Sequence, residues 1–188
     1  PRAQPPRGLL VVDAQVHLWK GHVPFAPAHR QVPDFTPEDA LKEMDAAGVS
    51  AAVIHPPTWD PDSNALAIEA ARRYPTRFAI LGNFPLDRPD SPTGIDRMKG
   101  QPGMLGLRFV MNQPHQQTWL TDGTLDWLWP AAERAGMPVA LLGPTGPVLA
   151  PLPDLGLADE RDTVFAVEMA LTDDLMLAFI RSGHDAEG

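Results

Sequence analysis

The run GLLVVDAQVHL, residues 8–18, changes character along its length. It begins with a continuous apolar stretch from Leu9 to Val12, partly β-branched and of strand length, which is typical of a strand buried on both faces. It ends in polar side chains that alternate with apolar ones. Polar groups at the end of a buried strand are typical of the functional edge of a parallel sheet. This run therefore indicates both a fold class and the place where the chemistry is expected.

The pattern of a short apolar run followed by a helical segment recurs along the chain. Strands are expected at residues 8–18, 49–57, 76–85, 103–111 and 137–144. Helices are expected at residues 35–48, 62–75, 92–101 and 122–136, the last kinked or restarted at Pro130. This alternation predicts a parallel sheet covered on both faces, either a closed (β/α) barrel or an open doubly wound sheet. The first strand is not followed by a glycine-rich phosphate-binding loop, which favours the barrel.

The alternation stops after the fifth expected strand. Residues 143–158 contain four prolines and three glycines, which predicts a loop. Residues 159–170 and 171–183 are expected to form two helices, the second with Thr172 as its N-cap and Gly183 at its end. A complete (β/α)8 barrel uses about 250 residues, or about 31 for each unit. We therefore expect an incomplete barrel, with an internal gap or deletion near residues 144–159.

The composition argues against several classes of protein. The 188 residues include 24 acidic and 15 basic ones, a net charge of −9, and the basic residues do not cluster, which argues against nucleic-acid binding. The absence of cysteine excludes disulfides and thiol catalysis. No apolar run is long enough to span a membrane, and the proline-rich start lacks the apolar part of a signal peptide. We expect one cytoplasmic domain over residues 1–188 with a small-molecule substrate, and a homo-oligomer stays open.

Four stretches carry a resemblance to a known family: residues 11–19, 44–87, 101–114 and 120–139. Over residues 9–142 the sequence resembles the amidohydrolase-related family of TIM-barrel metal-dependent hydrolases, which includes lactonases, pyrone dicarboxylate hydrolases and some decarboxylases. The resemblance implies a (β/α)8 TIM barrel and hydrolysis of an ester-like or lactone bond in a small carboxylated compound, with decarboxylation as an alternative. The family's D-H pair after strand six and G-[ST]-D after strand eight have no counterpart in this sequence. The general base is therefore not assigned.

Gln15 and His17 stand where much of the superfamily has an H-x-H pair. Residues i and i+2 of a strand share a face, so two histidines there can bind one Zn²⁺, whereas an amide is a poor ligand. We expect His17 to take part in catalysis and to be a ligand if a divalent metal, zinc or manganese, is bound. Gln15 is a candidate substrate contact. In the alternative interpretation both side chains only form hydrogen bonds at the strand end. Asp13 is expected on the same face, buried and in a supporting role.

Arg108 lies between apolar residues of an expected buried strand. A guanidinium there is unfavourable unless it meets an acid or an anionic substrate. The resemblance implies that Arg108 meets the carboxylate or lactone oxygen of the substrate, and a salt bridge with Asp13 is the alternative. Further candidates for substrate contact follow the other strands: His55, Trp59, Asn83 and Asn112.

A different class of function follows if the deletion is real. An open parallel sheet would expose a strand edge, and proteins cover such edges by pairing. The chain would then be a non-catalytic partial barrel that acts as a binding or assembly partner.

Overall fold

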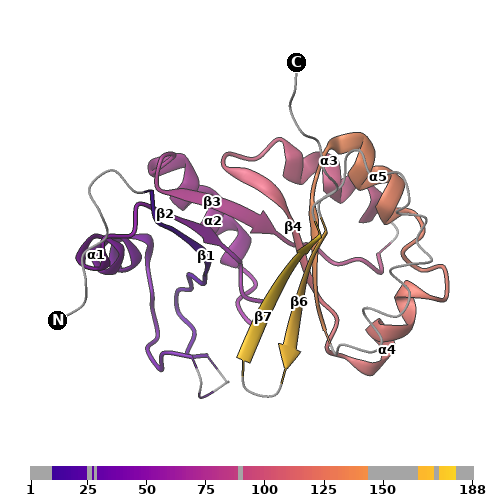
Figure 1. The fold of residues 1–188 in the computed structure, drawn as a ribbon, viewed down its shortest axis with the longest axis horizontal. Coiled ribbons are helices and arrows are strands. Elements are labelled where there is room, and N and C mark those ends of the chain that lie inside the picture. Colours follow the sequence, from indigo (N-terminus) through magenta and orange to yellow (C-terminus); the bar gives the residue numbers. More distant parts are fainter. Residues whose placement is uncertain are drawn as a thin grey trace. The chain divides into compact units, whose positions relative to one another are not determined.

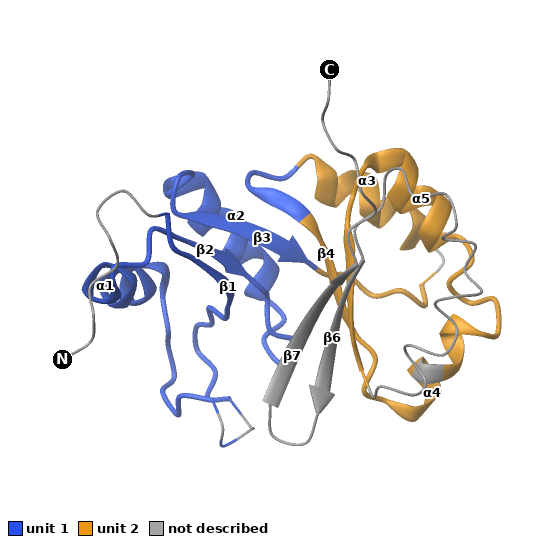
Figure 2. Ribbon diagram, viewed as in Figure 1, with its two compact units in different colours: residues 1–82, 101–105 blue, residues 83–100, 106–188 orange. Residues whose placement is uncertain are grey.

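The structure is a computed structural model, and it describes residues 10–24, 27, 29–88, 91–143, 165–171 and 174–180. The chain divides into two compact units, which Figure 2 colours separately. Unit 1 comprises residues 1–82 and 101–105, and unit 2 comprises residues 83–100 and 106–188. The loop and the gap expected between residues 144 and 159 lie outside the described residues. The expectation of a single domain over residues 1–188 stays a prediction.

Unit 1 alternates strands and helices in the order that the sequence predicts (Figure 1). Its elements are β1 (Val12–Val16), α1 (Pro37–Ala47), β2 (Ala51–Ile54), α2 (Ser63–Arg73) and β3 (Phe78–Gly82). Strand β2 pairs in parallel with both β1 and β3. Buried apolar side chains of the helices and strands form one core, which includes Met44, Ile54, Ala70 and Ile80. The parallel pairing and the intervening helices confirm the predicted βα units in this part of the chain.

Helix α1 begins and ends at residues that satisfy its terminal backbone groups. The Thr36 hydroxyl accepts a hydrogen bond from the backbone N–H of Asp39 (3.3 Å), and the Asp39 carboxylate accepts bonds from the backbone N–H (3.0 Å) and the hydroxyl (2.7 Å) of Thr36. Pro37 occupies the first turn, and Gly48 ends the helix in the left-handed conformation with φ +74°. These are the capping signals that locate a helix from sequence.

The start of β1 is exposed, so the expectation of a fully buried first strand is wrong. The side chains of Leu10 and Val12 are 71% and 48% exposed. The register with β2 shifts between Asp13 and Val16. At this place Oδ1 of Asp13 accepts a hydrogen bond from the backbone N–H of Gln15 (2.9 Å). This local bond competes with the strand ladder and interrupts the alternation of faces, and it leaves Asp13 exposed rather than buried.

Unit 2 contains the later strands and several short helices. Strand β4 (Met104–Val110) begins in unit 1 and continues into unit 2. The other elements are a 3-10 helix (Ser91–Thr93), α3 (Gly94–Lys99), α4 (Pro114–Gln117), a second 3-10 helix (Thr118–Leu120), α5 (Leu128–Ala135), β5 (Val139–Gly143), β6 (Phe165–Leu171) and β7 (Asp174–Ile180). Strand β5 pairs in parallel with β4 and β6. Pro130 lies in the first turn of α5, where its missing N–H leaves no helical bond unmade.

Residues 165–171 and 174–180 are strands, so the expectation of two helices in this region is wrong. Strand β6 extends the sheet beside β5, and β7 folds back antiparallel to β6. Each has seven residues, six of them apolar and one acidic, and at this length helix and strand cannot be separated by periodicity. The edge of β5 opposite β4 offers backbone partners to β6, and this pairing outweighs the local capping signals of the segment.

The described residues hold fewer than eight βα units, and this confirms the expectation of an incomplete barrel. Every helix in the described part of the chain is too short or too polar to span a bilayer.

A substitution at Gly103 tests the packing between α2 and the sheet. Gly103 has φ +71°, and an added Cβ would lie 2.6 Å from the Cβ of Ala71. We expect Gly103→Ala to lower the free energy of unfolding by about 2 kcal/mol or more, because it adds backbone strain to a steric overlap. Gly100→Ala is the matched control, since the nearest atoms to its added Cβ lie at 3.9 Å. Equal urea midpoints for the two variants would contradict this prediction.

The capping box of α1 makes stability depend on pH. Hydrogen bonds from the backbone N–H and then the hydroxyl of Thr36 hold the pKa of Asp39 below its ordinary value. A lowered folded-state pKa contributes stability that is complete above the ordinary value and is lost as pH falls through the lowered one. We therefore expect Asp39→Asn to destabilise the chain at pH 7, and the difference from wild type to shrink below about pH 4. Urea unfolding at several pH values measures it, and a constant difference would rule out this role for Asp39.

Candidate functional site

His17 and His55 directly follow two neighbouring parallel strands. The pairing of β1 with β2 places Val16 opposite Ile54, and the backbone N–H of His55 donates to the carbonyl oxygen of Val16 (2.8 Å). In addition, Nδ1 of His17 forms a hydrogen bond of 2.6 Å with the carbonyl oxygen of His55. A carbonyl oxygen only accepts, so Nδ1 carries the proton and Nε2 carries the lone pair of the neutral ring. This places a basic nitrogen at the carboxyl edge of the sheet.

A cluster of aromatic rings surrounds His17, and we call it the ring cluster: His17, Trp19, His29, His55 and Trp59. The His17 ring centroid lies 5.5 Å from that of His29, 5.8 Å from that of Trp59 and 6.5 Å from that of His55. The Trp59 ring lies 4.8 Å from His29 and 6.4 Å from Trp19. Trp19 and His55 are buried, whereas the other members are half-buried. The half-buried rings are the ones that a small molecule can contact.

A buried carboxylate, Asp60, joins the segments that follow β1 and β2. Its side chain is 1% exposed, and it accepts hydrogen bonds from the backbone N–H groups of Lys20 (3.3 Å) and Asp62 (2.9 Å). Nε2 of His22 lies 3.8 Å from Oδ1 of Asp60. Since Trp59 directly precedes Asp60, these contacts also hold the segment that carries the indole.

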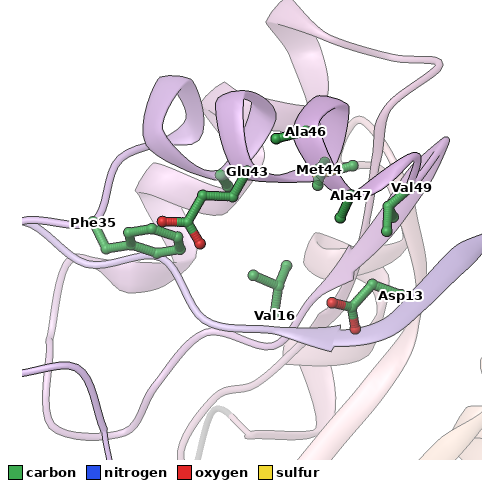
Figure 3. Close-up of a pocket in the computed structure, with 9 residues that line it drawn as sticks. Asp13, Val16, Phe35, Glu43, Met44, Ala46, Ala47 and Val49 are labelled. Carbon is green, nitrogen blue, oxygen red and sulfur yellow. The ribbon is translucent and has the colours of Figure 1, made fainter. Parts of the chain in front are cut away.

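A second feature of unit 1 is a hollow of about 390 Å³ under α1, lined by Asp13, Val16, Phe35, Ala40, Glu43, Met44, Ala46, Ala47 and Val49. Figure 3 shows Phe35 and Glu43 at one end of it and Asp13 and Val49 at the other. Hydrogen bonds from Arg30 hold the pKa of Glu43 below its ordinary value. The lining contains no imidazole. This hollow therefore offers apolar surface and carboxylates but not the chemistry of the ring cluster.

The candidate residues of the later strands belong to unit 2. Arg108 is 6% exposed and lies between the buried side chains of Leu107 and Phe109 on β4, as the sequence predicts. Asn83 is half-buried directly after β3, and Asn112 is exposed just after β4. The expectation that Arg108 contacts the substrate stays a prediction. Asp13 is exposed, so the expectation that it is buried is wrong, whereas its salt bridge with Arg108 stays a prediction.

The residues of the ring cluster do not by themselves fit a divalent metal site. His17 is oriented as metal-binding histidines are, with one ring nitrogen bound to a carbonyl oxygen. Gln15, two residues earlier, supplies an amide and not a second imidazole. Across the part of the chain that the structure describes, no group of three or more His, Cys, Asp or Glu side chains is placed to hold a metal ion.

Sequence reasoning missed His29 and Asp60. His29 lies in the segment between β1 and α1, at no fixed spacing from His17, so no strand or helix pattern indicates it. Asp60 follows a proline-rich turn, and the available signal is its place two residues before Asp62, the residue that directly precedes α2. Short polar residues at that place form hydrogen bonds to nearby backbone N–H groups.

A family model described as amidohydrolase matches residues 12–180, most of the chain. The chain belongs to this amidohydrolase family. The match confirms the resemblance found in the sequence. No curated protein matches this amidohydrolase chain.

Solved structures show the same barrel fold at low sequence identity. A probable 2-pyrone-4,6-dicarboxylic acid hydrolase from Acinetobacter baumannii, with citric acid bound, matches with a TM-score of 0.62 and 17% identity over 86% of this chain and 58% of that one. A zinc-bound amidohydrolase from Burkholderia multivorans matches at 0.54 and 16% over 84% and 69%. A 5-carboxyvanillate decarboxylase from Novosphingobium aromaticivorans, with manganese and a nitrobenzoic acid, matches at 0.54 and 18% over 71% and 50%. This amidohydrolase chain thus spans about half to two thirds of these proteins.

Removal of the Asp60 carboxylate tests its role in holding the two segments. We expect Asp60→Ala to lower the free energy of unfolding by about 2 kcal/mol, because two backbone N–H groups lose their acceptor. Asp62→Ala is the matched control, since Asp62 is exposed and its side chain does not cap α2. Urea unfolding compares the variants, and an equal loss in both would show that Asp60 does not hold these segments.

Proposed function

We propose that this amidohydrolase chain hydrolyses an ester-like or lactone bond of a small carboxylated compound. The observation that carries the proposal is the orientation of His17, whose Nδ1 is bound to the carbonyl oxygen of His55 at the carboxyl edge of β1 and β2. In barrels of this kind, that edge is the catalytic one. Family membership supports hydrolysis in general, and the choice of lactone rests on the neighbour described as a pyrone dicarboxylic acid hydrolase.

His17 supplies a nitrogen that can take a proton. With Nδ1–H donated to a carbonyl oxygen, Nε2 of the neutral ring is the basic atom. Water attacks the carbonyl carbon of the lactone, a new C–O bond forms, and the ring C–O bond breaks. One proton of the water passes to the leaving oxygen by way of a base and gives a hydroxyl group, and the carboxylic acid formed releases the other proton to solvent and becomes a carboxylate. We assign to His17 the contact with this water or with the reacting carbonyl group.

Arg108 supplies the positive charge that an anionic substrate requires. Its guanidinium is almost fully buried on β4, and a buried cation is most favourable next to an anion. Arginine also binds carboxylates through two parallel hydrogen bonds. In this proposal Arg108 holds a substrate carboxylate or the oxygen that becomes negative, and Gln15, His55, Trp59, Asn83 and Asn112 stay candidates for further contacts.

Binding of zinc or manganese stays a prediction for this chain. It is supported by a zinc-bound and a manganese-bound protein among the solved neighbours. Among the described residues only His17 is assigned as a ligand, and no step above depends on a metal. Decarboxylation is the second candidate, supported by the neighbour described as a 5-carboxyvanillate decarboxylase.

The proposed reaction is tested with purified chain, with and without added ZnCl₂ or MnCl₂. Loss of 2-pyrone-4,6-dicarboxylate, followed by its ultraviolet absorbance, reports hydrolysis, and release of CO₂ from 5-carboxyvanillate reports decarboxylation. Hydrolysis of the pyrone or of a simpler carboxylated lactone supports the proposal. Release of CO₂ without hydrolysis replaces it by the second candidate, and activity on neither class of compound refutes both.

We expect Arg108→Met to lower kcat/KM by about 100-fold or more, because the substrate anion loses its charged partner. Arg134→Met removes an exposed arginine of α5 and serves as the control. Thermal unfolding of both variants separates a loss of activity from a loss of fold. Full turnover by Arg108→Met, with reduced stability only, would assign Arg108 a structural role instead.

A further inference from the structure

The hollow under α1 is large enough to hold a small molecule. Buried apolar side chains, Phe35, Ala40 and Met44, form its floor, and its open sides carry half-buried and exposed residues. Figure 3 shows Val16 of β1 pointing toward the side of α1 that carries Met44. Its volume is about 390 Å³, and none of the described residues that line it belongs to the ring cluster. Small-molecule pockets typically measure about 300–1,000 Å³, so the hollow lies within that range.

The two ends of the hollow carry carboxylates with different surroundings. The guanidinium of Arg30 donates to both oxygens of Glu43, and it also lies over the ring of Phe35 at 4.7 Å. This ion pair compensates the charge at one end. At the other end the exposed Asp13 accepts a hydrogen bond from the backbone N–H of Gln15 through Oδ1. Within the described residues of unit 1, none of the ion pairs includes Asp13. Unit 1 therefore leaves the charge of Asp13 uncompensated.

The chemistry of the lining favours a cation with an apolar body. The described side chains that line the hollow are either apolar or carboxylates, so none of them donates a hydrogen bond. An anionic ligand would find no donor among them and would be repelled by Asp13. An ammonium group, in contrast, can donate to Oδ2 of Asp13, and an alkyl chain can cover Val16, Met44 and Val49.

We propose that the hollow binds a small alkylammonium compound, whose ammonium group contacts Asp13 and whose chain lies between β1 and α1. This binding site goes beyond the proposed reaction, because it uses neither His17 nor Arg108. Most of the affinity comes from the chain, since an exposed ion pair contributes little. Each buried methylene group is expected to raise the affinity about threefold.

Nuclear magnetic resonance titration of the ¹⁵N-labelled chain measures this binding. The probes are butylammonium and hexylammonium, with hexan-1-ol and hexanoate as ligands of the same chain length but different charge. We expect hexylammonium to bind about 10-fold more tightly than butylammonium and about threefold more tightly than hexan-1-ol, and to shift amide signals of β1 and α1. Equal binding of hexanoate and hexylammonium, or no dependence on chain length, would overturn the inference.

Asp13→Asn tests the charge at the open end. Asparagine can still accept the hydrogen bond from the backbone N–H of Gln15, but it carries no charge. We expect this variant to bind hexylammonium about threefold more weakly and hexan-1-ol as before. The matched control is Asp62→Asn, because Asp62 is exposed directly before α2 and does not line the hollow. An equal loss in both variants would show general attraction of cations to an acidic chain and would overturn the inference.

Ala47→Phe tests the hollow itself by filling it from α1. Ala65→Phe is the matched control, because Ala65 is an exposed alanine of α2 outside the lining. Thermal unfolding shows whether both variants fold. We expect Ala47→Phe to lose measurable binding of hexylammonium and Ala65→Phe to keep it, and retained binding in Ala47→Phe overturns the inference. Binding that appears only in Arg108→Met also overturns it, in favour of a salt bridge between Asp13 and Arg108.

Discussion

The hydrogen bond from Nδ1 of His17 to the carbonyl oxygen of His55 links the ends of two strands and orients the imidazole of the candidate site. At 2.6 Å it joins a side chain that follows β1 to a backbone atom that follows β2. It exists only because the two strands are parallel and in register, with Val16 opposite Ile54. The same bond selects the tautomer of His17 and restricts its ring, so that the basic nitrogen keeps one direction. Strand pairing therefore determines which ring nitrogen of neutral His17 carries the proton.

The segments beyond the strands need their own support, since loops carry site residues but contribute little packing. In unit 1 this support is the buried carboxylate of Asp60, which accepts backbone N–H groups from both segments. Each of its oxygens accepts a backbone N–H, so this buried polar group has donors in place of water. The antiparallel bridge of Trp19 with Phe35 fixes the return of the chain toward α1, close to the segment that carries His29. The backbone that carries the half-buried rings is thus held by the hydrogen bonds of Asp60 and by the bridge of Trp19 with Phe35.

The elements with strong local signals could be predicted from the sequence. Helix α1 has its capping box and terminal glycine, and Arg108 stands out as a charge in an apolar strand, so both lie where they were expected. The failures have physical causes. The Asp13 side chain accepts a hydrogen bond from the backbone N–H of Gln15, and this bond disturbs the strand that was expected to be regular. The runs that form β6 and β7 are short, and their structure is decided by pairing, of β6 with β5 and of β7 with β6. His29 could not be predicted from the sequence, because only tertiary contacts bring it close to His17.

Gln15 limits what this edge of the sheet is suited to hold. A metal site needs several ligands at fixed distances and angles, which rigid strands provide and a connecting segment provides less readily. At the end of β1 only His17 offers an imidazole, because Gln15 supplies an amide, and the Nδ1–H of His17 is already donated to the carbonyl oxygen of His55. The strand end therefore supplies one basic nitrogen with a fixed direction, which suits contact with a single polar group better than the binding of a metal by strand residues alone.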